Sequence, residues 1–364
     1  MHPDTPDRIS PRTRRSLVRL LVFPAYLLIL VELMARLAVG VSGVVLDSSY
    51  GYPPDIFQEH PTRGYSYVEG FQGHFPNANF SDIPISINSD GFRDRDFVVD
   101  KSDHRILVLG DSITFGAGIA ASDRYTEEIS RQICPNNRCV VMNLGVNGYQ
   151  IGNYEAVLNE QISRLKPDLV IIGFCMNDIQ TAATVDQVAK ARRAGWIETL
   201  RGVLAHSVAM RLVARQLRSA SWDAEQYRHS WIEKATRAWS SEENEVELAA
   251  TLVRLKLRAR QANARTIAII FPERSQLEDF ARWGSSYEAA ARIFGDVQIP
   301  FVSGRTVLLG NPRSNEPGFI DSAYLPGDNV HFTPDAHRTF GRALASLIDE
   351  LSVDSSAKGS DQRN

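Results

Sequence analysis

Short apolar runs alternate with longer amphipathic segments from residue 105 to the C-terminal region. The runs are four to six residues long, too short for buried helices but typical of strands covered on both faces of a sheet. They are Ile106–Leu109, Val140–Asn143, Leu169–Phe174, Thr266–Phe271 and Gln298–Val302. Because strands that alternate with helices favour right-handed crossovers, we expect an α/β domain with a five-stranded parallel sheet.

The segments between these runs show helical periodicity. In the segment before Lys166-Pro167, for example, apolar side chains recur every three or four positions and the proline ends the pattern. Helices are predicted over Ser122–Ile133, Tyr149–Leu165, Leu277–Phe294 and from Thr333-Pro334 to Leu351. The polar tail, residues 352–364, is expected to be disordered.

Two further segments do not follow the alternating pattern. Residues 47–100 are rich in Gly, Pro, Asn and aromatic residues, which predicts short strands and turns packed on the main domain, residues 101–351. Arg93 in this segment is assigned a structural role, although it could reach the cleft. Residues 179–263 are helical in character and are interpreted as an insertion that the sheet does not need. An insertion at the carboxyl end of a strand could form a lid or a substrate wall.

The N-terminal region predicts a membrane anchor. Residues 1–19 contain five arginines, and the apolar segment 20–46 that follows is long enough to cross a bilayer as a helix. Its charged residues, Glu32 and Arg36, are four positions apart and could pair. The arginines place the N-terminus in the cytoplasm and the rest of the chain outside. Cleavage after the small residues at 38–40, as in a signal peptide, is the competing interpretation.

Composition argues against several classes of protein. The chain has 364 residues, 43% of them hydrophobic, and a formal net charge of −3, so no basic excess points to nucleic acid. The three cysteines are too few for a disulfide scaffold and lack metal-site spacing. Cys134 and Cys139 flank a turn and could form a local disulfide or remain two buried thiols. Cys175 lies within a predicted strand and is interpreted as a core residue.

Chemically distinctive residues follow the predicted strands in four blocks. The first strand ends at Gly110-Asp111-Ser112, which would place a serine hydroxyl at the carboxyl edge of the sheet, where open α/β sheets bind ligands. The later blocks are Asn143–Gly148, Gly173–Asp178 and Asp328–His331. Together they resemble the SGNH, or GDSL-type, hydrolase family over roughly residues 105–351. The resemblance implies a flavodoxin-like three-layer α/β/α fold and an esterase, lipase or carbohydrate deacetylase activity.

The four blocks supply the parts of a serine esterase. A serine is a poor nucleophile until an oriented base takes its proton, and Asp328, three residues before His331, can orient that histidine toward Ser112. The resemblance implies the same roles. The oxyanion could be bound by the backbone N–H groups of Ser112 and Gly148 and the side-chain amide of Asn177. Gly148 is preferred to Gly145 because the family places this glycine five residues after the asparagine of its block; Gly145 then serves the turn.

The predicted function is therefore ester hydrolysis through an acyl-serine intermediate, with neither cofactor nor metal. The substrate would be an O-acyl, such as O-acetyl, group of an extracytoplasmic carbohydrate or lipid. An O-acyltransferase that uses the same residues on a cell-surface polysaccharide is the main alternative. Two further hypotheses are a non-catalytic carbohydrate-binding module and a metal-dependent phosphoesterase. The latter would use Asp111, Asp178, Asp328 and His331, because carboxylates at strand ends can hold a divalent cation.

Overall fold

The computed structural model describes most of the chain in several stretches. These are residues 11–42, 53, 56–75, 83–97, 104–134, 139–179, 207–210, 212–213 and 237–361. The chain divides into two compact units, one of residues 1–47 with 196–223 and the other of residues 48–195 with 224–364. Each unit is described separately.

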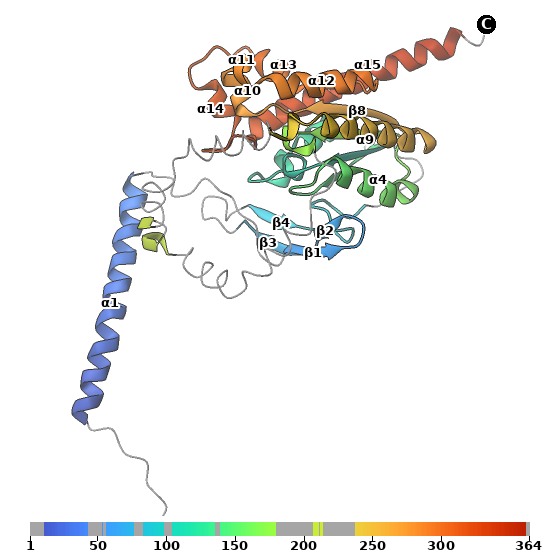
Figure 1. Cartoon of the computed structure of the whole chain (residues 1–364). Coiled ribbons are helices and arrows are strands. Elements are labelled where there is room, and N and C mark those ends of the chain that lie inside the picture. The colour runs from blue at the N-terminus through green and yellow to red at the C-terminus, as the bar shows by residue number, and fades with distance from the viewer. Residues whose placement is uncertain are drawn as a thin grey trace, which may run out of the picture. The chain divides into compact units, whose positions relative to one another are not determined.

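The larger unit is built on one parallel sheet of five strands (Figure 1). The strands are β5 (His104–Gly110), β6 (Cys139–Gly145), β7 (Leu169–Phe174), β8 (Arg265–Ile270) and β9 (Phe301–Ser303). They lie in the order β6-β5-β7-β8-β9, and every neighbouring pair is parallel. This is the flavodoxin-like order, in which the chain reverses direction across the sheet beside its first strand. The predicted α/β fold and five-stranded sheet are confirmed.

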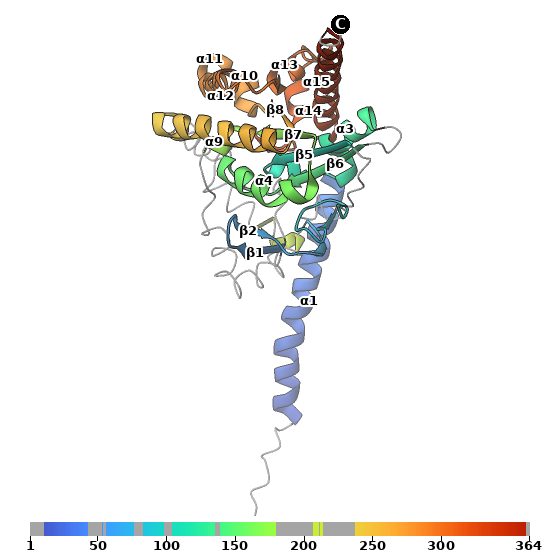
Figure 2. The same ribbon diagram turned by 90° about the vertical axis from the view of Figure 1, so that its right-hand side faces the viewer.

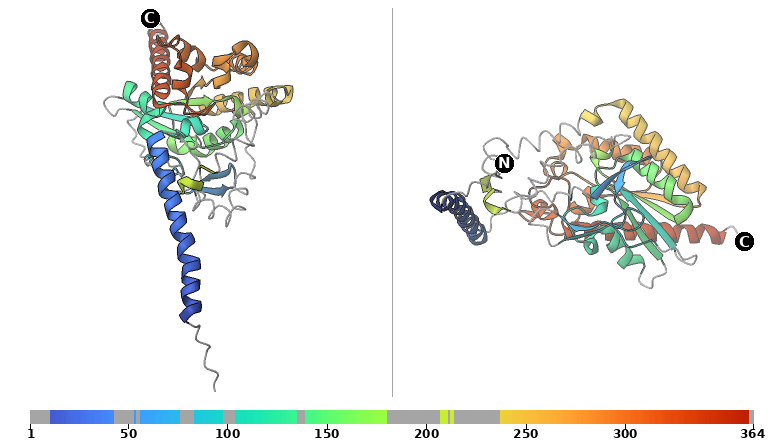
Figure 3. Two further views of the ribbon diagram at one scale, coloured as in Figure 1. Left: turned by 90° about the vertical axis from the view of Figure 1, so that its left-hand side faces the viewer. Right: turned by 90° about the horizontal axis from the view of Figure 1, so that it is seen from below.

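Helices cover both faces of the sheet, as the right-hand view of Figure 3 shows. One face is covered by α4 (Ile151–Leu165), α9 (Glu242–Gln261) and α12 (Ser285–Asp296), and α4 and α9 lie side by side (Figure 2). The other face is covered by α3 (Tyr125–Ile133) and α15 (Pro334–Asp361). Alternate residues of β5 enter the two cores, which explains why its sequence is a continuous apolar run.

Helix α9 corrects part of the predicted insertion over residues 179–263. It is the crossover that joins β7 to β8, and its apolar side chains belong to the core. Within the same range Trp239 is buried, and its Nε1 donates to the carbonyl of Met176 at 2.7 Å. The other three tryptophans of the range, Trp196, Trp222 and Trp231, lie outside the described residues.

Two C-terminal predictions also differ from the structure. The single helix expected over 277–294 is three helices, α10 (Arg274–Glu278), α11 (Phe280–Trp283) and α12, because the side chain of Asp279 caps α11 by accepting from Arg282 N. Helix α15 continues to Asp361, past the expected end at Leu351, so the tail expected to be disordered is largely helical. No proline interrupts this stretch. Other short helices of the larger unit include α2 (Ser112–Phe115), α13 (Gly304–Leu309), α14 (Phe319–Ala323) and the 3₁₀ helices η2 (Ala121–Asp123) and η3 (Met176–Ile179).

The segment before the sheet forms two antiparallel hairpins. They are β1 (Phe57–His60) with β2 (Gly64–Tyr67), and β3 (Gln72–His74) with β4 (Pro84–Ser86). Tyr65 and Tyr67 are buried in the same hydrophobic cluster as the apolar face of α4. The segment is therefore part of the core of the larger unit.

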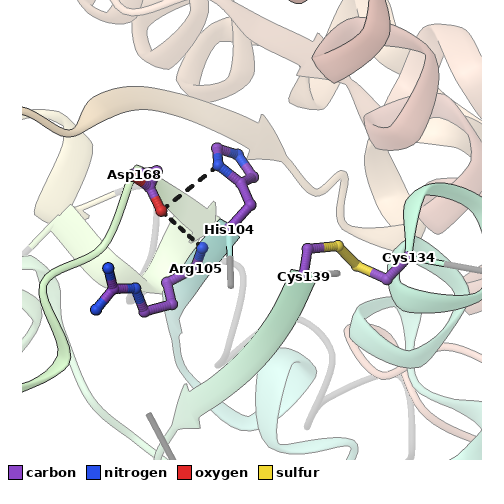
Figure 4. Close-up of a disulfide and its surroundings, with 5 residues drawn as sticks. All are labelled: His104, Arg105, Cys134, Cys139 and Asp168. Atoms are coloured by element: carbon purple, nitrogen blue, oxygen red, sulfur yellow. Dashed lines mark hydrogen bonds and ion pairs between the residues drawn. A yellow bond between two sulfur atoms is a disulfide. The ribbon is translucent and has the colours of Figure 1, made fainter. Parts of the chain in front are cut away.

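A disulfide joins Cys134, at the end of α3, to Cys139, at the start of β6 (Figure 4). Their Cα atoms are 5.2 Å apart. The sequence left open whether these cysteines form a disulfide or remain two buried thiols, and the structure has the disulfide. It lies at the amino end of the sheet, beside His104, which pairs with Cys139 in the β5–β6 register. Cys175 is a buried free thiol, so its predicted core position is confirmed, but it lies directly after β7 and not within a strand.

The smaller unit contains α1 (Pro11–Ser42). Arg36 Nε lies 2.8 Å from a carboxylate oxygen of Glu32, so the predicted pair is formed. Glu32 also accepts from Ser207 Oγ at 2.7 Å and from the backbone N–H groups of Val208 and Ala209 at 2.9 and 3.1 Å. The sequence predicts a membrane-spanning helix over 20–46, but no helix in the described part of the chain is both long and apolar enough to cross a membrane.

Candidate active site

The serine stands at a tight turn between a strand and a helix. Strand β5 ends at Gly110, and the carboxylate of Asp111 caps α2 by accepting from Ile113 N at 2.9 Å. Ser112 is thus the first residue of the helix and is half-buried. The helix lasts one turn and ends at Gly116, whose φ of 80° lies in the left-handed region that glycine adopts without strain. The predicted position of Ser112 at the carboxyl edge of the sheet is confirmed.

A row of three glycines lets this helix lie directly on the sheet. Gly110 pairs in register with Gly145 on one side and with Gly173 on the other. A Cβ at Gly110 would collide with Thr114 Oγ1, one at Gly145 with Phe115 N, and one at Gly173 would lie 2.6 Å from Thr114 Oγ1. The sequence analysis assigned Gly145 to a turn. In the structure it is the last residue of β6, and it permits the close packing of α2 on the sheet.

A continuous chain of hydrogen bonds joins the three residues of the predicted triad. Ser112 Oγ lies 2.8 Å from His331 Nε2, and His331 Nδ1 lies 2.8 Å from Asp328 Oδ2. The other oxygen of Asp328 accepts from the backbone N–H groups of Val330 and His331 at 2.8 and 3.0 Å. The same carboxylate therefore orients the imidazole and shapes the loop that carries it.

Electrostatics around the histidine favour its protonated form. Burial alone would lower the pKa of His331, but the charge and hydrogen bond of Asp328, with the charge of Asp111, raise it above 6.5. Burial would raise the pKa of Asp328, but His331 and the backbone donors outweigh burial and hold it below 3.8. The carboxyl of Asp328 therefore stays ionised beside His331.

Two other carboxylates, those of Asp111 and Asp178, are fully buried behind the serine. Asp178 accepts from Tyr154 OH at 2.8 Å and from Cys175 N at 2.7 Å. Burial raises the pKa of both carboxyls, and the charge of Asp111 raises that of Asp178 further. Both accept from neighbouring groups of their own turns, and the described residues contain no group of three His, Cys, Asp or Glu side chains placed to hold a metal.

The predicted oxyanion donors follow the two strands that flank β5. Gly148 lies in the loop after β6 with a φ of 72°, and Asn177 lies in η3, after β7. The side chain of Asn177 is one of the groups that lower the pKa of Asp111 against the larger effect of burial. No described residue accepts a hydrogen bond from the backbone N–H group of Ser112 or Gly148.

Several residues near the site have structural roles. Arg93 is buried and donates to the carbonyls of Phe115, Gly116 and Ile119 at 3.3, 2.7 and 3.0 Å, so it braces the end of α2 and confirms the structural interpretation. His337 is also buried, and its Nδ1 accepts from Tyr125 N at 3.2 Å.

The hairpin residues Tyr65 and Tyr67, which the sequence analysis did not single out, bind the loop before Gly148. The only sequence feature that points to them is the alternating Tyr-Ser-Tyr pattern. It predicts that both tyrosines are buried, but it does not predict which groups their hydroxyls bond.

A serine, a histidine and a carboxylate in hydrogen-bonded sequence at the carboxyl edge of a parallel sheet define a serine hydrolase. The comparison with protein families gives its kind: the chain belongs to the GDSL-like lipase/acylhydrolase family, whose sequence model matches residues 108–339. The protein is accordingly a serine esterase of the SGNH type.

The comparison with solved structures finds several that are similar to part of this chain. TesA is 14% identical, with 68% of this chain and 99% of TesA covered and a TM-score of 0.41. The acetyl xylan esterase AlAXEase is 12% identical, with coverages of 67% and 99% and a TM-score of 0.44. A catalytic mutant of Axe2, an acetylxylan esterase from Geobacillus stearothermophilus, is 16% identical, with coverages of 68% and 94% and a TM-score of 0.41. A comparison with curated proteins finds no match.

Proposed function

We propose that Ser112 is the nucleophile, His331 the general base and Asp328 the residue that orients the base. The observation that carries the proposal is the unbroken path from Ser112 Oγ through His331 to Asp328, with both links at 2.8 Å. As Oγ attacks the ester carbonyl, Nε2 takes its proton; the imidazolium then returns that proton to the leaving alkoxide. The product of this step is an acyl-serine and a free alcohol.

The developing negative charge on the carbonyl oxygen needs donors that are already in place. The backbone N–H groups of Ser112 and Gly148 and the amide of Asn177 would supply three, all at the edge where β5, β6 and β7 end. Preorganised donors of this kind typically contribute ~3 kcal/mol each to the transition state. In the second half of the reaction, His331 would activate a water that releases the acid and restores Ser112.

The proposed substrates are O-acyl groups, such as O-acetyl groups, on an extracytoplasmic carbohydrate or lipid. The location, on which this substrate class depends, is itself proposed: a single-pass anchor over residues 20–46 with the N-terminus in the cytoplasm. Its support is the run of arginines before an apolar segment, the neutralisation of Glu32 by Arg36, and a disulfide between Cys134 and Cys139, since disulfides persist in oxidising compartments.

The catalytic proposal is tested with purified protein and p-nitrophenyl acetate. Wild-type protein should release p-nitrophenol, and Ser112→Ala should lose turnover while its unfolding temperature is unchanged. The activity should survive EDTA, because the base is already hydrogen-bonded to the serine and no metal is needed to activate it. Activity in Ser112→Ala, or loss in EDTA restored by Mn²⁺, would refute the mechanism. Adding a glycan acceptor separates hydrolysis from acyl transfer, since only a transferase would form acylated glycan.

The location is tested by the N-terminal sequence of the mature protein. An intact N-terminus recovered from carbonate-washed membranes is the expected result. A mature chain that begins near Val41 would mean that the segment is cleaved and the anchor does not exist.

A further inference from the structure

Two tyrosine hydroxyls from the β1–β2 hairpin hold both backbone groups of Asn147, the residue before Gly148. Tyr65 OH donates to the carbonyl of Asn147 at 2.6 Å, and the N–H of Asn147 donates to Tyr67 OH at 2.9 Å. Tyr65, Tyr67 and Asn147 are at most 6% exposed. These hydrogen bonds therefore form away from competing water, where a hydrogen bond is electrostatically strong.

The first of these bonds determines where the N–H of Gly148 points. The carbonyl of Asn147 and the N–H of Gly148 belong to one planar peptide unit, and no described peptide bond is cis. In a trans unit the two groups point in opposite directions. Since the carbonyl of Asn147 is directed at Tyr65 OH, the N–H of Gly148 must be directed away from the hairpin.

The second bond holds the preceding peptide unit, which contains the N–H of Asn147. With both units held, the two backbone dihedrals of Asn147 have little freedom. This matters because Gly148 has a φ of 72° and, lacking a side chain, has few steric restraints of its own. An unbraced glycine would let the N–H turn, and a donor that must be turned into place stabilises the oxyanion less.

We propose that Tyr65 and Tyr67 are positioning residues that aim the N–H of Gly148 at the oxyanion. The inference rests on the proposed oxyanion role of Gly148 and extends the active site to a hairpin about 45 residues before Ser112, outside the residues matched by the family model. It follows that the sheet domain alone, without residues 56–68, would carry the triad but would not hold the N–H of Gly148 in position.

Other contacts keep the hairpin docked when a single hydroxyl is removed. The side-chain amide of Asn153 donates to the carbonyl of Arg63 at 3.0 Å, Tyr149 OH donates to the carbonyl of Tyr65, and Arg63 Nε lies 3.1 Å from Glu160. A phenylalanine at position 65 keeps the ring and both of these backbone contacts. Tyr65→Phe therefore removes the bond to Asn147 while these contacts remain.

The test compares Tyr65→Phe with Tyr287→Phe, a matched control. Tyr287, on α12, is 4% exposed and its hydroxyl donates to a backbone carbonyl, that of Ile270, at 3.0 Å. The other partners of this hydroxyl are Ser303 and Arg305, so it bonds no residue of the loop before Gly148. With p-nitrophenyl acetate, we expect Tyr65→Phe to lower kcat ~10-fold with KM within about twofold of wild type. This is less than the ~10²–10³-fold loss typical when an oxyanion donor is deleted. Tyr287→Phe should leave kcat unchanged.

A second measurement uses a phosphonate ester, which reacts covalently with the serine. In this reaction a phosphonyl oxygen carries negative charge at the position of the oxyanion. Its inactivation rate should fall by the same factor as kcat in Tyr65→Phe. Unchanged kcat, a change confined to KM, or a loss of kcat matched by a drop in unfolding temperature beyond that of Tyr287→Phe would overturn the proposal. If Tyr65→Phe does not fold, Tyr67→Phe is judged by the same criteria. Wild-type protein without esterase activity would instead refute the proposed function itself.

Discussion

Replacing Asp328 with asparagine separates the electrostatic role of this residue from its role in shaping the loop. An asparagine can keep its oxygen as the acceptor for Val330 N and His331 N, so the loop conformation should survive. Its NH₂ group would then face His331 Nδ1, where a carboxylate oxygen now lies at 2.8 Å. That group is a donor, so it stabilises the tautomer that carries its proton on Nε2 and cannot take the proton of Ser112.

The magnitude follows from the charge that is lost. A carboxylate in contact with an ionisable group typically shifts its pKa by about 1–3 units, each unit being ~1.36 kcal/mol. His331 acts as a base only when neutral, and its raised pKa places the acid limb of the wild-type profile above pH 6.5. In Asp328→Asn the effect of burial is opposed only by Asp111, so the limb should move to lower pH. The same change in other Ser-His-Asp triads lowers kcat by ~10⁴-fold.

The assay is kcat/KM for p-nitrophenyl acetate between pH 5 and 9, with the pKa of His331 followed in parallel by NMR. The expected result is a large loss of kcat together with an acid limb displaced to lower pH. A variant whose limb stays at the wild-type pH would show that Asp328 does not set the pKa of His331. A variant that keeps a tenth or more of wild-type activity would show that it does not orient the base.

Three further predictions concern the oxyanion donor, the disulfide and the buried histidine. Asn177→Ala should lower kcat ~10²–10³-fold with little change in KM, and a change confined to KM would remove Asn177 from the oxyanion site. The double variant Cys134→Ser/Cys139→Ser should lose about 2 kcal/mol in urea unfolding, because the bridge closes a loop with a sequence separation of only 5; wild-type stability in the variant would contradict the bridge. Burial, with the charges of His331 and Arg124, lowers the pKa of His337 to about 3, so below pH 6.5 the unfolded chain takes up a proton that the folded chain does not. The proton uptake should therefore lower the free energy of unfolding of the wild type by about 2 kcal/mol between pH 7 and 5. His337→Phe should lack this contribution, and an equal decrease in the two proteins would refute the assignment.

Several features of this protein follow from local sequence. A short apolar run such as Leu169–Phe174 is typical of a strand buried on both faces, and polar residues that follow such strands meet at one edge. This reasoning predicts from the sequence that Ser112 and Asn177 lie at the same edge of the sheet. The spacing of Asp328 and His331 is also local, because three residues of one turn suffice to join a carboxylate to an imidazole.

Other features depend on contacts between distant residues. The amphipathic pattern of α9 shows that a helix exists, but not whether it crosses the sheet or belongs to an insertion, since both require an apolar face. Likewise, a glycine at position 145 is compatible with a turn or with another element packed closely on the backbone. Only its pairing with Gly110 in the sheet shows that α2 packs there.

The hairpin tyrosines show this limit most clearly. Tyr65 and Tyr67 read as ordinary buried aromatics of a short strand, because burial leaves a periodic pattern in the sequence and a hydroxyl's partner does not. Their bonds to Asn147 span about 80 residues, and they exist only once the hairpin has packed beside the loop before α4. Local sequence thus determined which residues are candidates for the chemistry, while tertiary packing decided which backbone groups are held in position beside them.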